Sequence, residues 1–261
     1  ISLETWEKRT IHLLYTSDCL HTDETSMRVN KQNHWIHVYS SNKLTLKMLH
    51  RKRGREAIDD IGIIPNYGGV IIHDCWASYL SYQHLDHGLC GSHLLRELTF
   101  IVDSNGYQWA KNIKRLLKRA CKMVSLRQDK CLTDKEFVKL QNMYQNILSK
   151  GEKEMPTIPK KSAKGRGPIA KSDAHNLWAR LFDFAPAVLL FAQLPHVPFT
   201  NNRAERDLRM AKVKQKVSGC FRTVEYAQAY CRISSYLQTM KNQGINPLIA
   251  INMAMSDSIP F

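Results

Sequence analysis

The sequence of 261 residues contains no apolar run long enough to span a membrane. A spanning helix needs about 18 or more mostly apolar residues, whereas the longest candidate here, residues 187–194, is short and contains Gln193. Internal repeats, a visible secretory signal and Cys-x-x-Cys pairs are also lacking, and the seven cysteines are irregularly spaced. We therefore expect reduced thiols in a cytosolic protein that does not enter a membrane.

Acidic residues are scarce relative to basic ones. Asp and Glu total 23 against 38 Lys and Arg, which gives a formal net charge of +15. With 43% hydrophobic residues the chain is too apolar for a disordered polybasic tail. Residues 108–171 hold 17 Lys and Arg against 5 acidic residues, and residues 200–245 hold 9 against 3. A folded chain with such basic segments indicates a polyanionic partner, usually a nucleic acid.

The apolar pattern of the first third predicts a mixed α/β sheet. Three extended segments, residues 20–29, 34–40 and 44–49, are separated by polar clusters, as in a three-stranded meander. A charged helix is expected over residues 51–61, and residues 70–72 then form a wholly apolar run typical of a strand buried on both faces. An antiparallel meander followed by a crossover to a parallel strand gives a mixed sheet.

The rest of the chain is predicted to be mainly helical. Residues 94–148 are expected to be helical, with an apolar stripe at three-to-four spacing over residues 113–124. Another helical stretch starts near Asp173 and is broken at Pro186. Asn201 and Asn202 can begin a last amphipathic helix.

Two segments are expected to lie outside this pattern. Residues 151–171 are rich in Lys, Gly and Pro and predict an exposed basic loop. Its part 160–171 fits a DNA-contacting arm and a solvated linker equally well. The chain begins at Ile1 rather than Met, so we expect it to be a fragment whose N-terminal segments are missing.

Three carboxylates lie at transitions in this pattern: Asp23 within the first strand, Asp74 at the end of the buried strand, and Glu205 near the start of the last helix. Each has a structural alternative. Asp23 fits an edge strand or turn, and Asp74 fits a helix N-cap. Glu205 fits a capping box with Asn202 or an ion pair with Arg209. Two Mg²⁺ ions about 3.5–4 Å apart need carboxylates from several elements, so two strand aspartates and a helix glutamate also fit a two-metal site.

Six segments, taken in order, resemble the catalytic domain of bacterial insertion sequence 66 family transposases. Each alone is a weak signal, but their order is specific, and the resemblance extends over nearly the whole chain, from about residue 18 to 255. They are Asp23-Glu-Thr25, Lys52-Arg-Gly-Arg-Glu-Ala57, His73-Asp-Cys-Trp-Ala-Ser-Tyr79, Leu89-Cys-Gly-Ser-His-Leu-Leu-Arg-Glu-Leu98, Val197-Pro-Phe-Thr-Asn-Asn-Arg-Ala-Glu-Arg-Asp-Leu-Arg209 and Lys212-Val-Lys-Gln-Lys-Val-Ser-Gly-Cys-Phe-Arg222.

The resemblance implies an RNase H-like α/β fold, a mixed sheet flanked by helices with a largely helical insertion before the Glu-bearing helix. The expected divisions are residues 1–18 as the end of a preceding helical region, 19–93 as the first part of the core, 94–198 as a helical basic insertion, 199–255 as the C-terminal helices of the core and 256–261 as a tail.

The resemblance also implies that Asp23, Asp74 and Glu205 form a DDE triad that binds two Mg²⁺ or Mn²⁺ ions. Such an enzyme cleaves DNA at the element ends and joins the freed 3′-OH to target DNA. We expect it to act as a homo-oligomer in the bacterial cytoplasm at the nucleoid, with accessory proteins of the same element as further candidate partners and no membrane contact.

Two positions depart from the family pattern, which often has Gly where this chain has Ser26 and Cys75. One alternative is therefore a catalytically inactive DNA-binding remnant of a transposase. Another is a related metal nuclease that only hydrolyses DNA.

Candidate DNA contacts surround the triad. Only Glu205 and Asp207 offset six cations between positions 203 and 216, which favours phosphate contact over a merely solvated face. Trp76 is predicted to line the site or the core, and an aromatic ring there can also stack on an unpaired base. The predicted DNA-binding residues are Arg203, Arg206, Arg209, Lys212, Lys214, Lys216 and Trp76.

Cys90 and His93 follow the second aspartate, and the resemblance implies that such a pair supports the edge of the site. With His84 and His87 they form a series spaced by three, which is a possible zinc set. A constant spacing of three suits a tetrahedral site only if the backbone turns there, so we favour the supporting role. His73 is expected to point away from the site.

Overall fold

The computed structural model describes residues 3–158 and 171–259, and the contacts between residues divide the chain into two compact units. The first unit joins Ile1–His87 to Asn201–Phe261, and the second is Gly88–Thr200. All three residues of the predicted triad belong to the first unit.

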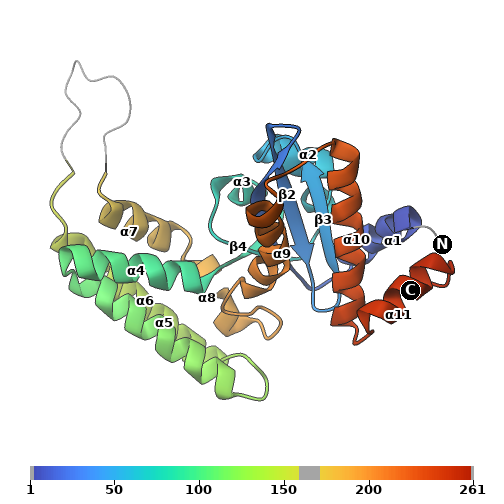
Figure 1. The fold of residues 1–261 in the computed structure, drawn as a ribbon. Coiled ribbons are helices and arrows are strands. Elements are labelled where there is room, and N and C mark those ends of the chain that lie inside the picture. Colours follow the sequence, from blue (N-terminus) through green and yellow to red (C-terminus); the bar gives the residue numbers. More distant parts are fainter. Residues whose placement is uncertain (1–2, 159–170, 260–261) are drawn as a thin grey trace. The chain divides into compact units, whose positions relative to one another are not determined.

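The first unit is built on a mixed sheet with the strand order β3-β2-β1-β4-β5. Three of these strands, β2, β3 and β4, are labelled in Figure 1. The first three strands form an antiparallel meander, β4 is parallel to β1, and β6 also pairs with β1 in parallel. The predicted meander and crossover are thus confirmed, whereas β5 and β6 were not predicted. The strands are β1 (Cys19–Val29), β2 (Gln32–Ser40), β3 (Thr45–His50), β4 (Val70–His73), β5 (Asp86–Leu89) and β6 (Cys220–Phe221).

Alternation along the strands sends side chains to two cores, one on each face of the sheet. On one face, Met27 and Val38 pack against α9 (Asn202–Ser218) and α10 (Val224–Asn242). On the other face, Leu20, Tyr39 and Ile71 pack with side chains of the helices that connect β3 to β5. These connecting helices are α2 (Arg55–Ile61), η1 (Ile64–Asn66) and α3 (Ala77–Leu80). Helices therefore cover both faces, and the predicted RNase H-like α/β fold is confirmed.

The helix predicted over residues 51–61 is shorter than expected. It begins at Arg55, because Gly54 before it is extended, and it ends at Gly62, whose φ of 76° lies in the left-handed region that glycine adopts without strain. Two further helices, α1 (Leu3–Tyr15) and α11 (Pro247–Met255), pack against α10, where Trp6 meets Tyr236 edge to face at 5.3 Å.

The second unit is helical in its described part, as predicted for the insertion. Its first helix ends at Gly106, with a φ of 71°, and Thr133 and Glu136 form a capping box at the third. Gly151 packs closely against Trp109. A Cβ added at this position would lie 2.5 Å from the Cβ of that tryptophan, which is too close for a larger residue without a shift. The helices are α4 (Gly91–Asn105), α5 (Gln108–Leu126), α6 (Asp134–Gly151), η2 (Glu152–Glu154), α7 (Asp173–Asp183) and α8 (Ala185–Gln193).

Two expectations concern segments at the limits of the structure. Residues 160–170 of the predicted basic loop lie outside the described residues, so its role as an arm or a linker stays open. A search of the helices that the structure describes found none both long and apolar enough to cross a membrane.

Candidate active site

The parallel pairing of β1 with β4 brings Asp23 and Asp74 to corresponding positions. His21 of β1 lies opposite Ile72 of β4. Asp23 and Asp74 each come two residues later, and neighbouring strands lie about 4.7–4.9 Å apart. Asp23 shares the face of Met27, which is covered by α9, whereas Glu24 points to the opposite face.

The negative charges of Asp74 and Glu205 act on Asp23, the third carboxylate of the predicted triad. Burial raises the pKa of Asp23 to about 6, although the Glu24 N–H donates to its Oδ1 at 2.8 Å. Lys212 lowers this pKa, whereas the negative charges of Asp74 and Glu205 raise it further. Three carboxylates therefore share one partly buried region in which their charges repel.

This donor set fits divalent metal ions. Mg²⁺ prefers oxygen ligands, and an added cation removes the repulsion that opposes ionisation of Asp23. Within the described residues, the oxygens of Asp23, Asp74 and Glu205 do not all lie within 4.8 Å of one another. Ligands of one Mg²⁺ lie at most about 4.2 Å apart, since each is about 2.1 Å from the ion. Two ions about 3.5–4 Å apart accept a wider spread of ligands.

Asp74 lies at the start of a strained turn. Its Oδ1 accepts a hydrogen bond from the Trp76 N–H at 3.2 Å. Asp74 therefore binds the backbone just before α3, although the cap residue of that helix is Trp76. Cys75 adopts a φ of 71°, in the left-handed region that favours glycine. The family preference for Gly at this position thus has a physical reason, and the Cβ of Cys75 makes the turn less favourable.

The buried His73 and the half-buried His87 hold this turn from the opposite face. The Cys75 N–H donates to Nδ1 of His73 at 3.1 Å, so the proton of His73 is on Nε2 and is donated to Nδ1 of His87, also at 3.1 Å. His87 then donates from Nε2 to the Tyr82 carbonyl at 3.1 Å. Burial lowers the pKa of His73 to about 3. As expected, His73 points away from the site, where its ring lies 5.2 Å from that of Tyr79.

Glu205 does not form the capping box with Asn202. Helix α9 begins at Asn202, its cap residue is Asn201, and the Asn201 side chain accepts no capping hydrogen bond from the helix. Instead, Asn201 donates from Nδ2 to the Thr22 carbonyl at 2.7 Å and accepts from Nδ1 of His21 at 2.9 Å. The start of α9 is thereby fixed to β1, next to Asp23.

Asp207 fixes α9 on the other side of Glu205. Ser40 and Thr45 each donate a hydroxyl hydrogen bond to Asp207 Oδ2 at 2.7 Å, and Arg203 donates from Nε at 3.2 Å. The side chain of Asp207 is fully buried. Asp207 was predicted to help offset the six cations of this helix, and it does pair with one of them, Arg203, but it does so in the interior of the protein. Arg203, only 17% exposed, is held inside with it.

The other predicted cations on α9 differ in their exposure. Arg206, Arg209, Lys212 and Lys216 are exposed. Lys214 is half-buried, with its Nζ 5.1 Å from the centre of the Phe221 ring. The DNA contacts of these cations stay predictions. For Arg203 the case is weaker, because its side chain pairs with the buried Asp207.

A polar cluster on the opposite face, around Glu24, escaped the sequence analysis. Glu24 accepts hydrogen bonds from Arg53 at 2.8 Å and from the Tyr79 hydroxyl at 3.0 Å, and burial raises its pKa to about 7. The Arg53 guanidinium also lies over the rings of Trp35 at 5.0 Å and Trp76 at 4.3 Å. The Arg53 guanidinium therefore occupies one face of the Trp76 ring, and the predicted stacking on a DNA base would have to use the other face. Since successive side chains of a strand point to opposite faces of the sheet, the adjacent Asp23 and Glu24 could have been predicted to place one carboxylate on each face.

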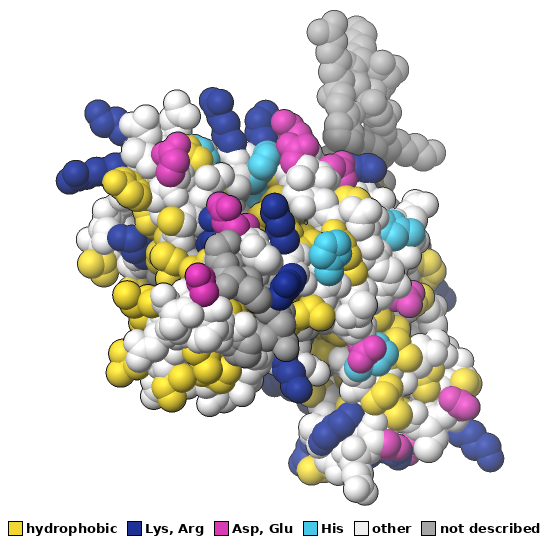
Figure 2. Space-filling model, turned by 90° about the vertical axis from the view of Figure 1, so that its right-hand side faces the viewer, with side chains coloured by type: hydrophobic (Ala, Val, Ile, Leu, Met, Phe, Trp, Pro, Cys, Tyr) yellow, Lys and Arg dark blue, Asp and Glu magenta, His cyan; other side chains and the backbone are white. Residues whose placement is uncertain are grey.

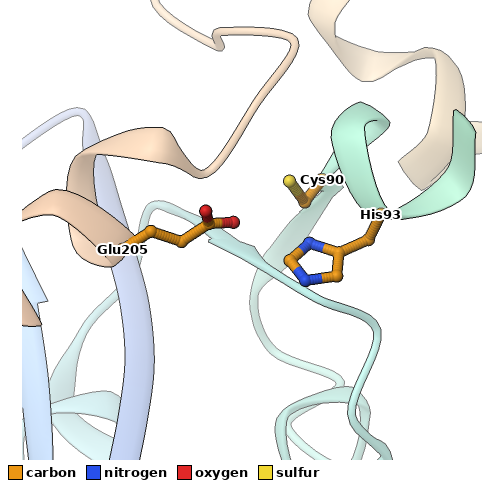
Figure 3. Close-up of side chains that lie close together, drawn as sticks. All are labelled: Cys90, His93 and Glu205. Carbon is orange, nitrogen blue, oxygen red and sulfur yellow. The ribbon is translucent and has the colours of Figure 1, made fainter. Parts of the chain in front are cut away.

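Cys90 and His93 belong to the second unit. Cys90 directly precedes α4 and His93 lies in its first turn, whereas Glu205 comes from α9 of the first unit (Figure 3). Their predicted supporting role stays a prediction. The zinc alternative loses one ligand, because both ring nitrogens of His87 are already hydrogen-bonded.

Comparison with known proteins supports the resemblance drawn from the motifs. The family described as "Transposase IS66 family" matches residues 2–229. Neither the search of curated proteins nor that of solved structures gave a match.

Proposed function

Because the chain belongs to the IS66 family of transposases, we propose that it is a catalytic domain that cleaves and joins DNA with two Mg²⁺ or Mn²⁺ ions. The observation that carries this proposal is that the charges of Asp74 and Glu205 act on Asp23, so the three carboxylates lie near one another where α9 covers one face of an RNase H-like sheet. When bound, the two ions would activate the attacking oxygen and stabilise the leaving oxygen of an in-line displacement.

The chain's own residues would hold these ions and orient the DNA. Asp23 and Asp74 would provide oxygens from neighbouring strands, and Glu205 would provide them from α9. Asp23 must give up its proton before it can bind a cation, and Lys212 favours the ionised form. The exposed ammonium of Lys212 also suits a DNA phosphate beside the acidic centre.

The reaction proposed has two steps at one site. Hydrolysis of a phosphodiester at the element end frees a 3′-OH, and that hydroxyl then attacks a phosphodiester of target DNA, releasing a new 3′-OH. Since each step exchanges one oxygen on phosphorus for another, neither a covalent protein intermediate nor a redox partner is needed. A homo-oligomer would pair two element ends.

The decisive test compares native protein with Asp74→Asn on DNA that carries the ends of the element. We expect native protein to nick the DNA and join its 3′-OH ends to a target, and Asp74→Asn to bind the same DNA without cutting it. Cleavage that persists in Asp74→Asn would refute the proposed site.

The same assay separates the two alternatives. A native protein that binds but does not cut, even with Mn²⁺, is an inactive remnant, an outcome that the strained Cys75 turn makes worth testing. Cutting without any joined product identifies a nuclease that only hydrolyses.

A further inference from the structure

Helix α5 of the second unit carries positive charges and no negative ones. It contains six Lys and Arg and not a single Asp or Glu. Arg115, Lys118, Arg119 and Lys122 are exposed, while Lys111 and Lys114 are half-buried. By contrast, the face shown in Figure 2 has Lys and Arg scattered among hydrophobic and acidic side chains.

The six cations share one side of the helix. At about 100° per residue, positions 111, 114, 115, 118, 119 and 122 fall within an arc of about 140°. The buried residues of α5 lie on the opposite side, where they pack within the second unit. These residues are Trp109, Ala110, Ile113, Leu116, Leu117 and Ala120.

This arrangement opposes formation of the helix. The six cations make seven pairs spaced by three or four residues, and each like-charge pair destabilises a helix by about 0.2–0.5 kcal/mol at low salt. None of the six forms an ion pair within the part of the chain that the structure describes. Glu154 contacts α5 at its start, where it accepts hydrogen bonds from the backbone N–H groups of Gln108 and Trp109 rather than pairing with one of the six cations.

We propose that this face of α5 binds the phosphate backbone of duplex DNA as a contact surface separate from α9. This inference rests on the proposed function, because it takes DNA as the partner. The cations extend over about 16 Å of helix at 1.5 Å per residue, with steps of about 4.5–6 Å between turns. Lys and Arg contact phosphates without reading bases, so the surface should hold DNA of any sequence.

The test measures DNA binding by the full chain in an Asp74→Asn background, so that no DNA is cut. In one variant, Lys111, Lys114, Lys118 and Lys122 are all changed to Gln. A control makes the same charge change at four exposed lysines of the first unit, Lys8, Lys31, Lys43 and Lys241. Fluorescence anisotropy gives the affinity for an element-end duplex and for an unrelated duplex of equal length, between about 50 and 200 mM salt.

We expect the slope of log affinity against log salt to fall by about 3–4 in the α5 variant, since each lost phosphate contact removes about 0.9. The fall should be equal on both duplexes, and the control should retain the parental slope. Because the variant removes like-charge pairs, its thermal unfolding temperature should not be lower than the parent's.

Three results would overturn the proposal: an unchanged slope, an equal change in the control, or a fall on the element-end duplex alone. Failure of the proposed function is read separately, as absence of cleavage by the native chain.

Discussion

Replacing Asp23 with Asn should make the metal-free protein more stable at neutral to alkaline pH, although it removes a proposed metal ligand. The reason is that burial and neighbouring carboxylates raise the pKa of Asp23 from 3.8 to about 6. Between these values the folded state binds more protons than the unfolded state. The contribution of Asp23 to stability is therefore present below about pH 4 and is lost as the pH rises to 6.

The size of the effect follows from the same shift. One pKa unit corresponds to about 1.4 kcal/mol, so the charged Asp23 costs up to about 3 kcal/mol above pH 6. Solvent around this partly exposed side chain reduces the figure, and we expect a gain of about 1–3 kcal/mol for Asp23→Asn at pH 8. Asn keeps an oxygen that can accept the Glu24 N–H hydrogen bond.

Urea unfolding in EDTA at pH 8 and at pH 4 measures this gain, with Asp18→Asn as a control at an exposed position of the same unit. The gain should be present at pH 8 and absent at pH 4. Adding Mg²⁺ should then stabilise the native protein, by about 2.7 kcal/mol at a hundred times Kd, and should stabilise Asp23→Asn much less. An Asp23→Asn variant that is no more stable than native at pH 8, or that gains equally from Mg²⁺, would refute the reasoning.

Three further predictions test the elements that hold the site. Cys75→Gly should raise stability by about 1 kcal/mol in urea unfolding, because glycine tolerates the positive φ, whereas Cys75→Ala should not; equal effects would contradict the strain. Asp207→Ala should lose about 3 kcal/mol in the same assay, since it leaves buried donors unpaired; a loss below about 1 kcal/mol would contradict that role. Arg203→Gln should reduce stability, while Arg209→Gln should reduce DNA affinity instead; the reverse pattern would refute the assignments.

Much of the first unit was predictable because polar clusters separate its first three strands and because β4 is almost wholly apolar. Three extended segments separated by polar clusters indicated the meander, and the apolar run of β4 indicated the crossover. The same pattern placed Asp23 and Asp74 on strands of one sheet, whereas the direct pairing of β1 with β4 came from the structure. The short strands β5 and β6 escaped prediction, since Asp86–Leu89 has little apolar alternation and Cys220–Phe221 is only two residues long.

The anchoring of α9 was harder to see. Asp207 lies among Arg and Lys and looks like a surface charge, yet it shares a helix face with Ala204, Leu208 and Ala211, all buried. That spacing was a usable signal. The partners of Asp207 come from Ser40 and Thr45, more than 160 positions earlier, and no local pattern encodes such a pairing.

The number of Mn²⁺ ions bound per chain in the presence of element-end DNA tests the central claim most directly. The account predicts two ions for the native protein. It predicts none for a variant in which Asp23 and Asp74 are changed to Asn and Glu205 is changed to Gln. Binding of two ions by that triple variant, or of none by the native protein, would contradict the assignment of these three carboxylates.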